Sequence, residues 1–234
     1  MNAQPMEPVE LAAAYELVVA KIRRSINLGV YLPGTKLPPE RMLAEQVSVS
    51  RTTLREAIRV LEGEGYVVSR RGVTGGITVV DRKHTQPQLR RLLTERFDEY
   101  QEFLDFRLAV ECAAARLAAV RRTKSDLKRL AEALDAMDPG QTPAVFNSFD
   151  TAFHLGIVDT ARNSIMRRTI EDARAEMWIP VAEYSQHVLP TAVAHHQEIY
   201  AAIKDKDPDR AAESVAAHIE SVREDMIDIV KRNA

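Results

Sequence analysis

The stretch Leu37-Pro38-Pro39-Glu40-Arg41, followed nine residues later by Ser50-Arg51-Thr52-Thr53-Leu54-Arg55-Glu56-Ala57, decides the fold of the first part of this chain. The two prolines suit the first positions of a short helix, which tolerate their fixed φ angle. Ser50 is a good N-cap for the helix that follows. The stretch therefore predicts two short helices joined by a tight turn, and the second begins with arginine and threonine, as in a helix-turn-helix that reads DNA.

The residues on either side extend this motif. Apolar side chains recur with helical spacing over residues 11–28, which predicts a helix before the stretch. The two expected short helices cover about 38–46 and 51–65. Two β-branched runs, 66–71 and 77–80, are separated by glycines and predict a β-hairpin. We therefore expect a winged helix-turn-helix domain, with three helices and a β-hairpin, over residues 1–80.

The rest of the chain has a different pattern. Residues 81–87 are polar and are expected to form a linker, and residues 88–234 are expected to form an all-α helical bundle. The expected helices span 88–97, 99–121, 124–137, 142–161, 164–186, 191–205 and 208–232. Pro180 predicts a kink or an early stop in the fifth of them. The fold class is therefore mainly α, with a winged helix-turn-helix followed by a helical bundle.

Composition places the protein among globular chains with no membrane partner. The chain has 234 residues, of which 45% are hydrophobic and 28% charged, and it contains no apolar run long enough to span a bilayer. It has one cysteine, Cys112, and no signal-peptide pattern at its N-terminus. We therefore expect a cytoplasmic protein. The net charge is −2, so affinity for DNA would depend on local arginines rather than on a broad basic field.

The N-terminal residues resemble the GntR family of bacterial transcription regulators, over residues 11–80. Besides the opening stretch, the resemblance rests on Gly29, Leu32-Pro33-Gly34, Leu61, Gly65 and Gly72. The C-terminal part resembles the FCD ligand-binding domain of the FadR-type subfamily, in Arg107-Leu108-Ala109-Val110-Glu111, Asp150-Thr151-Ala152-Phe153-His154, Asn163, His196-Gln197-Glu198-Ile199 and Ala216-Ala217-His218. The resemblance implies a homodimeric transcription factor, most often a repressor, whose affinity for DNA is set by a small effector.

Seven residues are candidate DNA contacts. Arg51 and Arg55 lie one turn apart on one face of the second short helix, and an arginine can donate two hydrogen bonds to one guanine. The resemblance implies DNA-contacting positions at Arg41, Arg51, Thr52, Thr53 and Arg55, and a wing tip that enters the minor groove at Arg71 and Gly72. The alternative is that these arginines are surface charges paired with Glu40, Glu56 or Glu62. One winged domain covers only a half-site, so we expect a dimer on a palindromic operator.

Four residues are candidate metal ligands. Asp150 and His154 are four apart on an expected helix and so share one face, while His196 and His218 lie on two later helices. One aspartate with three neutral imidazoles could bind zinc, nickel or manganese. The spacing alone is weak evidence, because isolated histidines are often surface or core residues. The resemblance to metal-binding FCD domains implies these four as ligands, with His196 preferred over its neighbour His195.

The resemblance also implies an organic acid as the effector, such as lactate, gluconate or a uronate. Arg107 is a candidate effector contact, with an ion pair to Glu111 as the alternative. Asn163 is a second candidate, with a helix N-cap as the alternative. Two other functions stay open: a metalloenzyme that uses the Asp/His site, and an architectural DNA-binding dimer without an effector. The sequence offers no separate general base such as the glutamate of a His-Glu-x-x-His motif, so we do not expect an enzyme.

Overall fold

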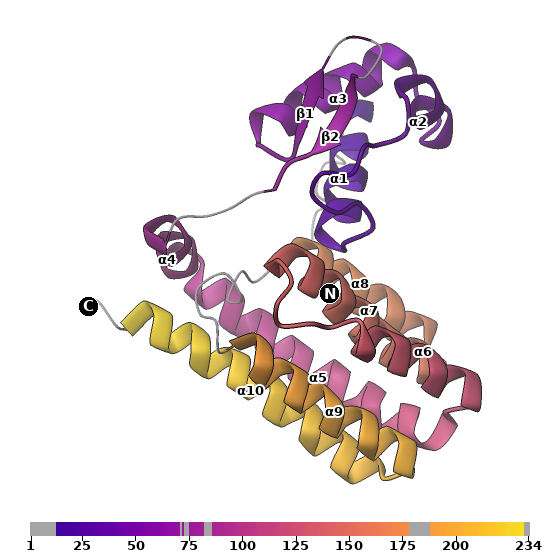
Figure 1. Ribbon diagram of the computed structural model, residues 1–234, viewed down its shortest axis with the longest axis vertical. Coiled ribbons are helices and arrows are strands. Elements are labelled where there is room, and N and C mark those ends of the chain that lie inside the picture. The colour runs from indigo at the N-terminus through magenta and orange to yellow at the C-terminus, as the bar shows by residue number, and fades with distance from the viewer. Residues whose placement is uncertain (1–12, 71, 73–74, 82–85, 178–187, 232–234) are drawn as a thin grey trace, which may run out of the picture.

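The structure is a computed structural model that describes residues 13–70, 72, 75–81, 86–177 and 188–231. Figure 1 shows a smaller N-terminal domain, drawn in indigo and purple, that lies against one side of a larger helical domain. This arrangement agrees with the fold class expected from the sequence.

The N-terminal domain is a winged helix-turn-helix. Its elements are α1 Ala14–Asn27, α2 Glu40–Gln46, α3 Arg51–Gly63, β1 Val67–Arg70 and β2 Gly76–Val79. The expected cap of the third helix is confirmed, since the Thr53 amide donates to Ser50 Oγ at 3.1 Å. The helix α2 begins later than expected because the residue before a proline is pushed out of the helical region, so Pro38 cannot belong to it. Pro39 accordingly has extended backbone angles and precedes the first helical residue.

The hairpin is antiparallel, and Val67 of β1 lies opposite Val79 of β2. The segment before α2 joins its outer edge, where Lys36 bridges to Thr78 and the Leu37 amide donates to Ile77 O at 2.8 Å. Side chains from α1, α2, α3 and both strands form one buried apolar cluster, whose larger members are Val18, Ile22, Leu37, Leu43, Leu54, Ile58, Leu61, Val67, Ile77 and Val79. The domain therefore has a core of its own.

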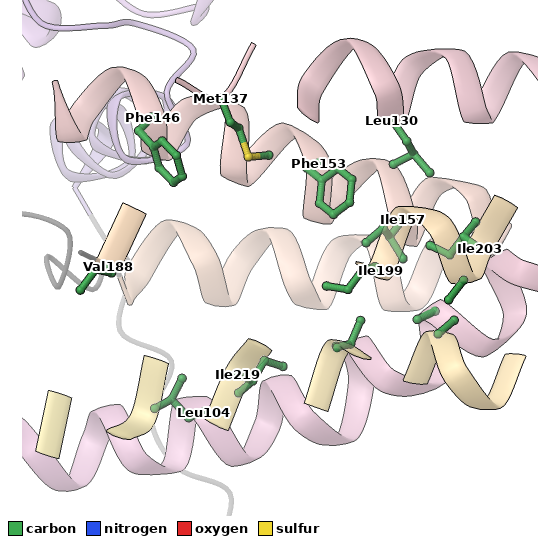
Figure 2. Close-up of a cluster of buried hydrophobic side chains, with 14 of the residues drawn as sticks. Leu104, Leu130, Met137, Phe146, Phe153, Ile157, Val188, Ile199, Ile203 and Ile219 are labelled. Carbon is green, nitrogen blue, oxygen red and sulfur yellow. The ribbon is translucent and has the colours of Figure 1, made fainter. Parts of the chain in front are cut away.

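Every element that the structure describes after Val80 is a helix. These are α4 Gln86–Glu95, α5 Phe97–Arg121, α6 Lys124–Asp135, α7 Pro143–Thr160, α8 Ser164–Glu176, α9 Val188–Asp205 and α10 Pro208–Lys231. The long helices α5 and α10 pack along each other, and α9 lies beside α10 (Figure 1). Figure 2 shows the core between them, where Leu104 of α5, Phe153 of α7 and Ile219 of α10 are buried with Ile199 and Ile203 of α9.

Several boundaries of the helical domain differ by a few residues or more from those expected. The helix α8 ends at Glu176, so the expected helix through residue 186 is too long; Met177 leaves the helical region with φ −108° and ψ 62°. Pro180 lies outside the described residues. The helix α4 begins at Gln86, inside the expected linker, and α9 begins at Val188, three residues before the expected start. None of the described helices combines the length and apolarity needed to cross a bilayer.

Candidate functional site

The exposed face of α3 carries the two arginines that the sequence places on one side. The Arg51 and Arg55 side chains are 61% and 57% exposed. Both face Glu40 Oε2, which lies 3.7 Å from Arg51 Nη2 and 3.0 Å from Arg55 Nε. The ion-pair alternative considered for these arginines is therefore present, with Glu40 as the partner. Exposed pairs of this kind contribute little free energy, so DNA can compete for both guanidinium groups.

The other candidate DNA contacts divide into three groups. Arg41 is 76% exposed, and its nearest carboxylate is Glu45 at 3.5 Å. Thr52 is exposed, whereas the Thr53 hydroxyl is bonded to Ser50 Oγ at 2.8 Å. At the wing, Gly72 is exposed with a φ of 108°, a backbone conformation that favours glycine, and Arg71 lies outside the described residues.

The four candidate metal ligands converge inside the helical domain. The helix α7 supplies Asp150 and His154, α9 supplies His196, and α10 supplies His218. One ligand atom from each residue lies within 4.8 Å of every other. The three histidines are between 0% and 3% exposed, so this group is buried in the bundle. His195, the competing neighbour, is only half-buried and is not part of the group.

The distances within this cluster suit a metal ion. His154 Nε2 and His196 Nε2 lie 3.3 Å apart, and Asp150 Oδ1 lies 3.6 Å and 3.3 Å from them. Two ligand atoms that bind one ion at about 2.1 Å with tetrahedral or octahedral angles lie roughly 3.0 to 3.4 Å apart. The buried Nδ1 atoms of His196 and His218 have no hydrogen-bond partner among the described residues. The cluster therefore fits a divalent cation.

Burial and neighbouring charges hold these groups in metal-binding forms. Burial lowers the pKa of His196, and burial together with the two neighbouring imidazoles lowers the pKa of His218 well below its usual range. Burial alone would raise the pKa of Asp150, but the Arg174 guanidinium, His154 and His196 together outweigh it and hold this pKa well below the usual range. The result is an ionised carboxylate beside the neutral imidazoles of His196 and His218, which are the forms that divalent ions require.

A second layer of side chains orients the cluster. Glu111 Oε2 lies 2.6 Å from His154 Nδ1, and Arg107 Nε donates to Glu111 Oε1 at 2.7 Å. Although burial favours the neutral form of Glu111, Arg107 and His154 hold its pKa well below the usual range. Arg174, which lies on α8, pairs with Asp150 Oδ2. Sequence reasoning missed Glu111 and Arg174 as parts of the site, because only the tertiary fold brings α5 and α8 against α7.

A cavity of about 100 Å³ adjoins the cluster. Its polar lining includes Asp150, His218, Arg107 and Arg174, and its apolar lining includes Phe103, Phe146, Leu189 and Val222. Arg107 thus lines the cavity and also makes the ion pair with Glu111 considered as its alternative role. Asn163 instead caps α8, where its Oδ1 accepts hydrogen bonds from the Ile165 and Met166 amides at 3.0 Å and 3.2 Å. The structure therefore favours the capping alternative for Asn163.

Each of the two domains matches a known family model. Residues 14–79 match the model described as bacterial regulatory proteins, gntR family, and residues 102–221 match the FCD domain. The chain is similar in fold to E. coli McbR/YncC, with a TM-score of 0.55, 22% identity and coverage of 93% of this chain and 99% of that one.

Curated relatives span most of the chain. A putative HTH-type transcriptional regulator, RmpR, from Mycobacterium gastri is 30% identical over 210 residues, which cover 87% of this chain and 77% of the relative. The Exu regulon transcriptional regulator of Escherichia coli (strain K12) is 31% identical over 230 residues, which cover 93% and 86%. These relatives are regulators rather than enzymes, in agreement with the expectation from the sequence. The chain belongs to the GntR family of bacterial regulatory proteins and is a DNA-binding transcriptional regulator with an FCD domain.

Proposed function

We propose that this regulator is a homodimeric repressor that binds a palindromic operator. It dissociates from the operator when a small organic acid binds at a metal ion in the helical domain. The observation that carries the proposal is the buried group of Asp150, His154, His196 and His218, whose ligand atoms lie within 4.8 Å of one another beside a cavity. Zinc, nickel and manganese are the candidate ions. When bound, the ion would offer open coordination positions to a carboxylate.

The charges around the cavity support an anionic effector. Two guanidinium groups, of Arg107 and Arg174, line the same small space. The Nε of Arg174 is a buried donor with no hydrogen-bond partner among the described residues, and a buried donor gains most from an acceptor that enters beside it. Arginine suits carboxylates because its fork of N–H groups matches their two oxygens. A carboxylate effector would therefore find both an ion and directional donors.

The DNA-binding part of the proposal rests on α3. Arg51 and Arg55 are exposed on one face, and Ser50 fixes where the helix begins. One such helix reads a half-site, so useful specificity calls for two copies on a symmetric site. The family resemblance suggests a short operator of the GT…AC type, with Arg41, Thr52 and Thr53 contributing to the major-groove face.

An architectural dimer without an effector is the weaker alternative. A domain that served dimerisation alone would be more stable with apolar side chains in its interior. Burying charged groups costs free energy that the pairing between them often fails to recover. This domain instead buries Arg107, Glu111 and His154 together, at 5%, 2% and 1% exposure. Such a group is better explained by a ligand that it binds.

Elemental analysis of the purified protein, together with thermal melting in the presence of lactate, gluconate or galacturonate, tests the proposal. We expect stoichiometric metal, and a rise in melting temperature with one of these acids that vanishes when a chelator is added. The variant His154→Ala should lose the metal, while His195→Ala, a matched change on the half-buried neighbour, should keep it. Metal-free wild-type protein with no chelator-sensitive shift would refute the metal-dependent effector site.

A further inference from the structure

The two domains meet where the end of α1 lies against α8. Asn27, the last residue of α1, donates from Nδ2 to the carbonyl oxygen of Ala175 at 2.8 Å. One turn earlier, the Arg24 guanidinium pairs with Glu171 at 3.1 Å and with Asp172 at 2.5 Å. Both contacts cross from the DNA-binding domain to the helical domain. Together they fix α1 on the last two turns of α8.

The chain that follows α1 also approaches α7 closely. Gly29 has a φ of 74°, and a Cβ added there would lie only 2.4 Å from Ser148 Cβ. Ser148 is two residues before the candidate ligand Asp150. The DNA-binding domain therefore contacts α7, which supplies two of the candidate ligands, and α8, which supplies Arg174.

The last turn of α8 contacts the Asp/His cluster through one residue and the DNA-binding domain through the next. Arg174 pairs with Asp150 Oδ2, while the next residue, Ala175, accepts the hydrogen bond from Asn27. The other oxygen of Asp150, Oδ1, faces His154 Nε2 and His196 Nε2. Arg174 thus restrains the Asp150 carboxylate through Oδ2 and leaves Oδ1 available as the candidate ligand atom. Asn27 also lines the cavity beside the cluster, although it belongs to the DNA-binding domain.

We propose that α1 docking and metal binding stabilise each other through the Arg174–Ala175 turn, an inference that rests on the proposed metal centre. Arg174 is a positioning residue that holds Asp150 Oδ1 toward the histidines, and Asn27 anchors the turn that carries Arg174. The end of a helix frays when its carbonyl groups lack partners, so loss of the Asn27 contact loosens Arg174. By linkage, a metal ion that binds more tightly to the docked form also favours docking by the same factor.

Zinc affinity of the full-length protein, measured by competition with a chelating dye, tests this coupling. Outer partners of metal ligands typically change metal affinity by about 10–100-fold. We expect Asn27→Ala and Asp172→Arg each to weaken zinc binding by about tenfold. The double variant Arg24→Glu with Asp172→Arg should recover most of the loss, because it restores an ion pair across the same contact.

Two control variants separate coupling from general damage. Thr169→Ala alters an exposed side chain on α8 itself, and Glu132→Arg reverses an exposed charge on α6. Both should bind zinc as the wild type does. Thermal melting of each variant without metal confirms that it is folded.

Hydrogen exchange gives an independent readout. Zinc should slow amide exchange in residues 24–30 of the wild type and leave the same residues of Asn27→Ala unchanged. Equal zinc affinity in all variants, with no zinc effect on residues 24–30, would overturn the coupling and leave the metal centre intact. A wild type that binds no zinc would overturn the metal centre as well, so the two failures are distinguishable.

Discussion

Glu111 Oε2 lies 2.6 Å from His154 Nδ1, which joins a carboxylate on α5 to an imidazole on α7. This contact directs the other ring nitrogen, Nε2, toward Asp150 and His196. Arg107 holds the opposite oxygen of Glu111 at 2.7 Å, so the carboxylate is restrained from both sides. A histidine that binds metal usually donates its second N–H to such a carboxylate, which fixes the ring and its tautomer.

The first prediction concerns this outer contact. Glu111→Gln keeps the size of the side chain but removes its charge, so the ring of His154 loses its strongest orienting partner. We expect zinc affinity to fall by about 10–100-fold, measured by competition titration. Glu132→Gln, an exposed change on α6, is the matched control and should have no effect. If Glu111→Gln bound zinc as tightly as the wild type, the orienting role of Glu111 would be wrong.

The second prediction concerns the ligands themselves. His218→Ala removes one of three imidazoles from the buried group, and we expect the purified variant to contain little or no metal. The effect should appear in elemental analysis rather than in folding, because a buried neutral histidine leaves no unpaired charge when it is removed. His195→Ala is the control. An unchanged metal content in His218→Ala would exclude this residue as a ligand.

The third prediction concerns stability at the start of α6. Asp126 is 1% exposed and accepts hydrogen bonds from the Thr123 amide at 2.8 Å and from Arg162 at 2.7 Å. Burial opposes its ionisation, but the bonds from Thr123 and Arg162 lower its pKa below the usual value. We expect Asp126→Asn to reduce the free energy of unfolding by about 1–2 kcal/mol at neutral pH, measured by urea titration.

The pH dependence of the difference in unfolding free energy between wild type and Asp126→Asn tests whether the charge of Asp126 causes that difference. Because the folded-state pKa of Asp126 is lowered, its ionised form stabilises the fold fully above the unfolded pKa of about 3.9. The contribution is lost as the pH falls below that value toward the folded-state pKa. The gap between wild type and Asp126→Asn should therefore shrink in acid. A gap that stayed constant from pH 7 to pH 3 would show that charge is not its origin.

Local patterns in the sequence predicted the N-terminal domain well. Ser50 caps α3 as expected, and Gly72 and Gly75 lie between the two strands, where the Gly75 amide donates to Gly72 O at 2.9 Å. Such features depend on residues a few positions apart. The grouping of Asp150 with His154 also followed from helical spacing, whereas the addition of His196 and His218 needed the family resemblance.

Contacts between distant segments could not be predicted in this way. Glu111 was noted only as a partner for Arg107 on its own helix, and its contact with His154 depends on how α5 packs against α7. Arg174 and Asn27 gave no sequence signal, because each acts through a helix that lies far away in the chain. The expected helix over 164–186 was too long, because α8 ends at Glu176, although Pro180 had predicted a kink or an early stop within it.

The fourth prediction concerns recognition of the operator. Arg51→Ala and Arg55→Ala should each weaken specific binding by about 5- to 150-fold, because a good bidentate contact to a base contributes roughly 1–3 kcal/mol. Both side chains are more than half exposed, so neither change should alter the melting temperature. Arg91→Ala removes an exposed arginine from α4 and serves as the control.

The operator assay must separate base contacts from phosphate contacts. Fluorescence anisotropy with the operator and with a scrambled duplex, at two salt concentrations, makes this distinction. Loss of a base contact reduces affinity for the operator but hardly for the scrambled duplex, whereas loss of a phosphate contact weakens both and lowers the salt dependence. If Arg51→Ala and Arg55→Ala both kept the wild-type preference for the operator, the exposed face of α3 would not be the surface that reads its sequence.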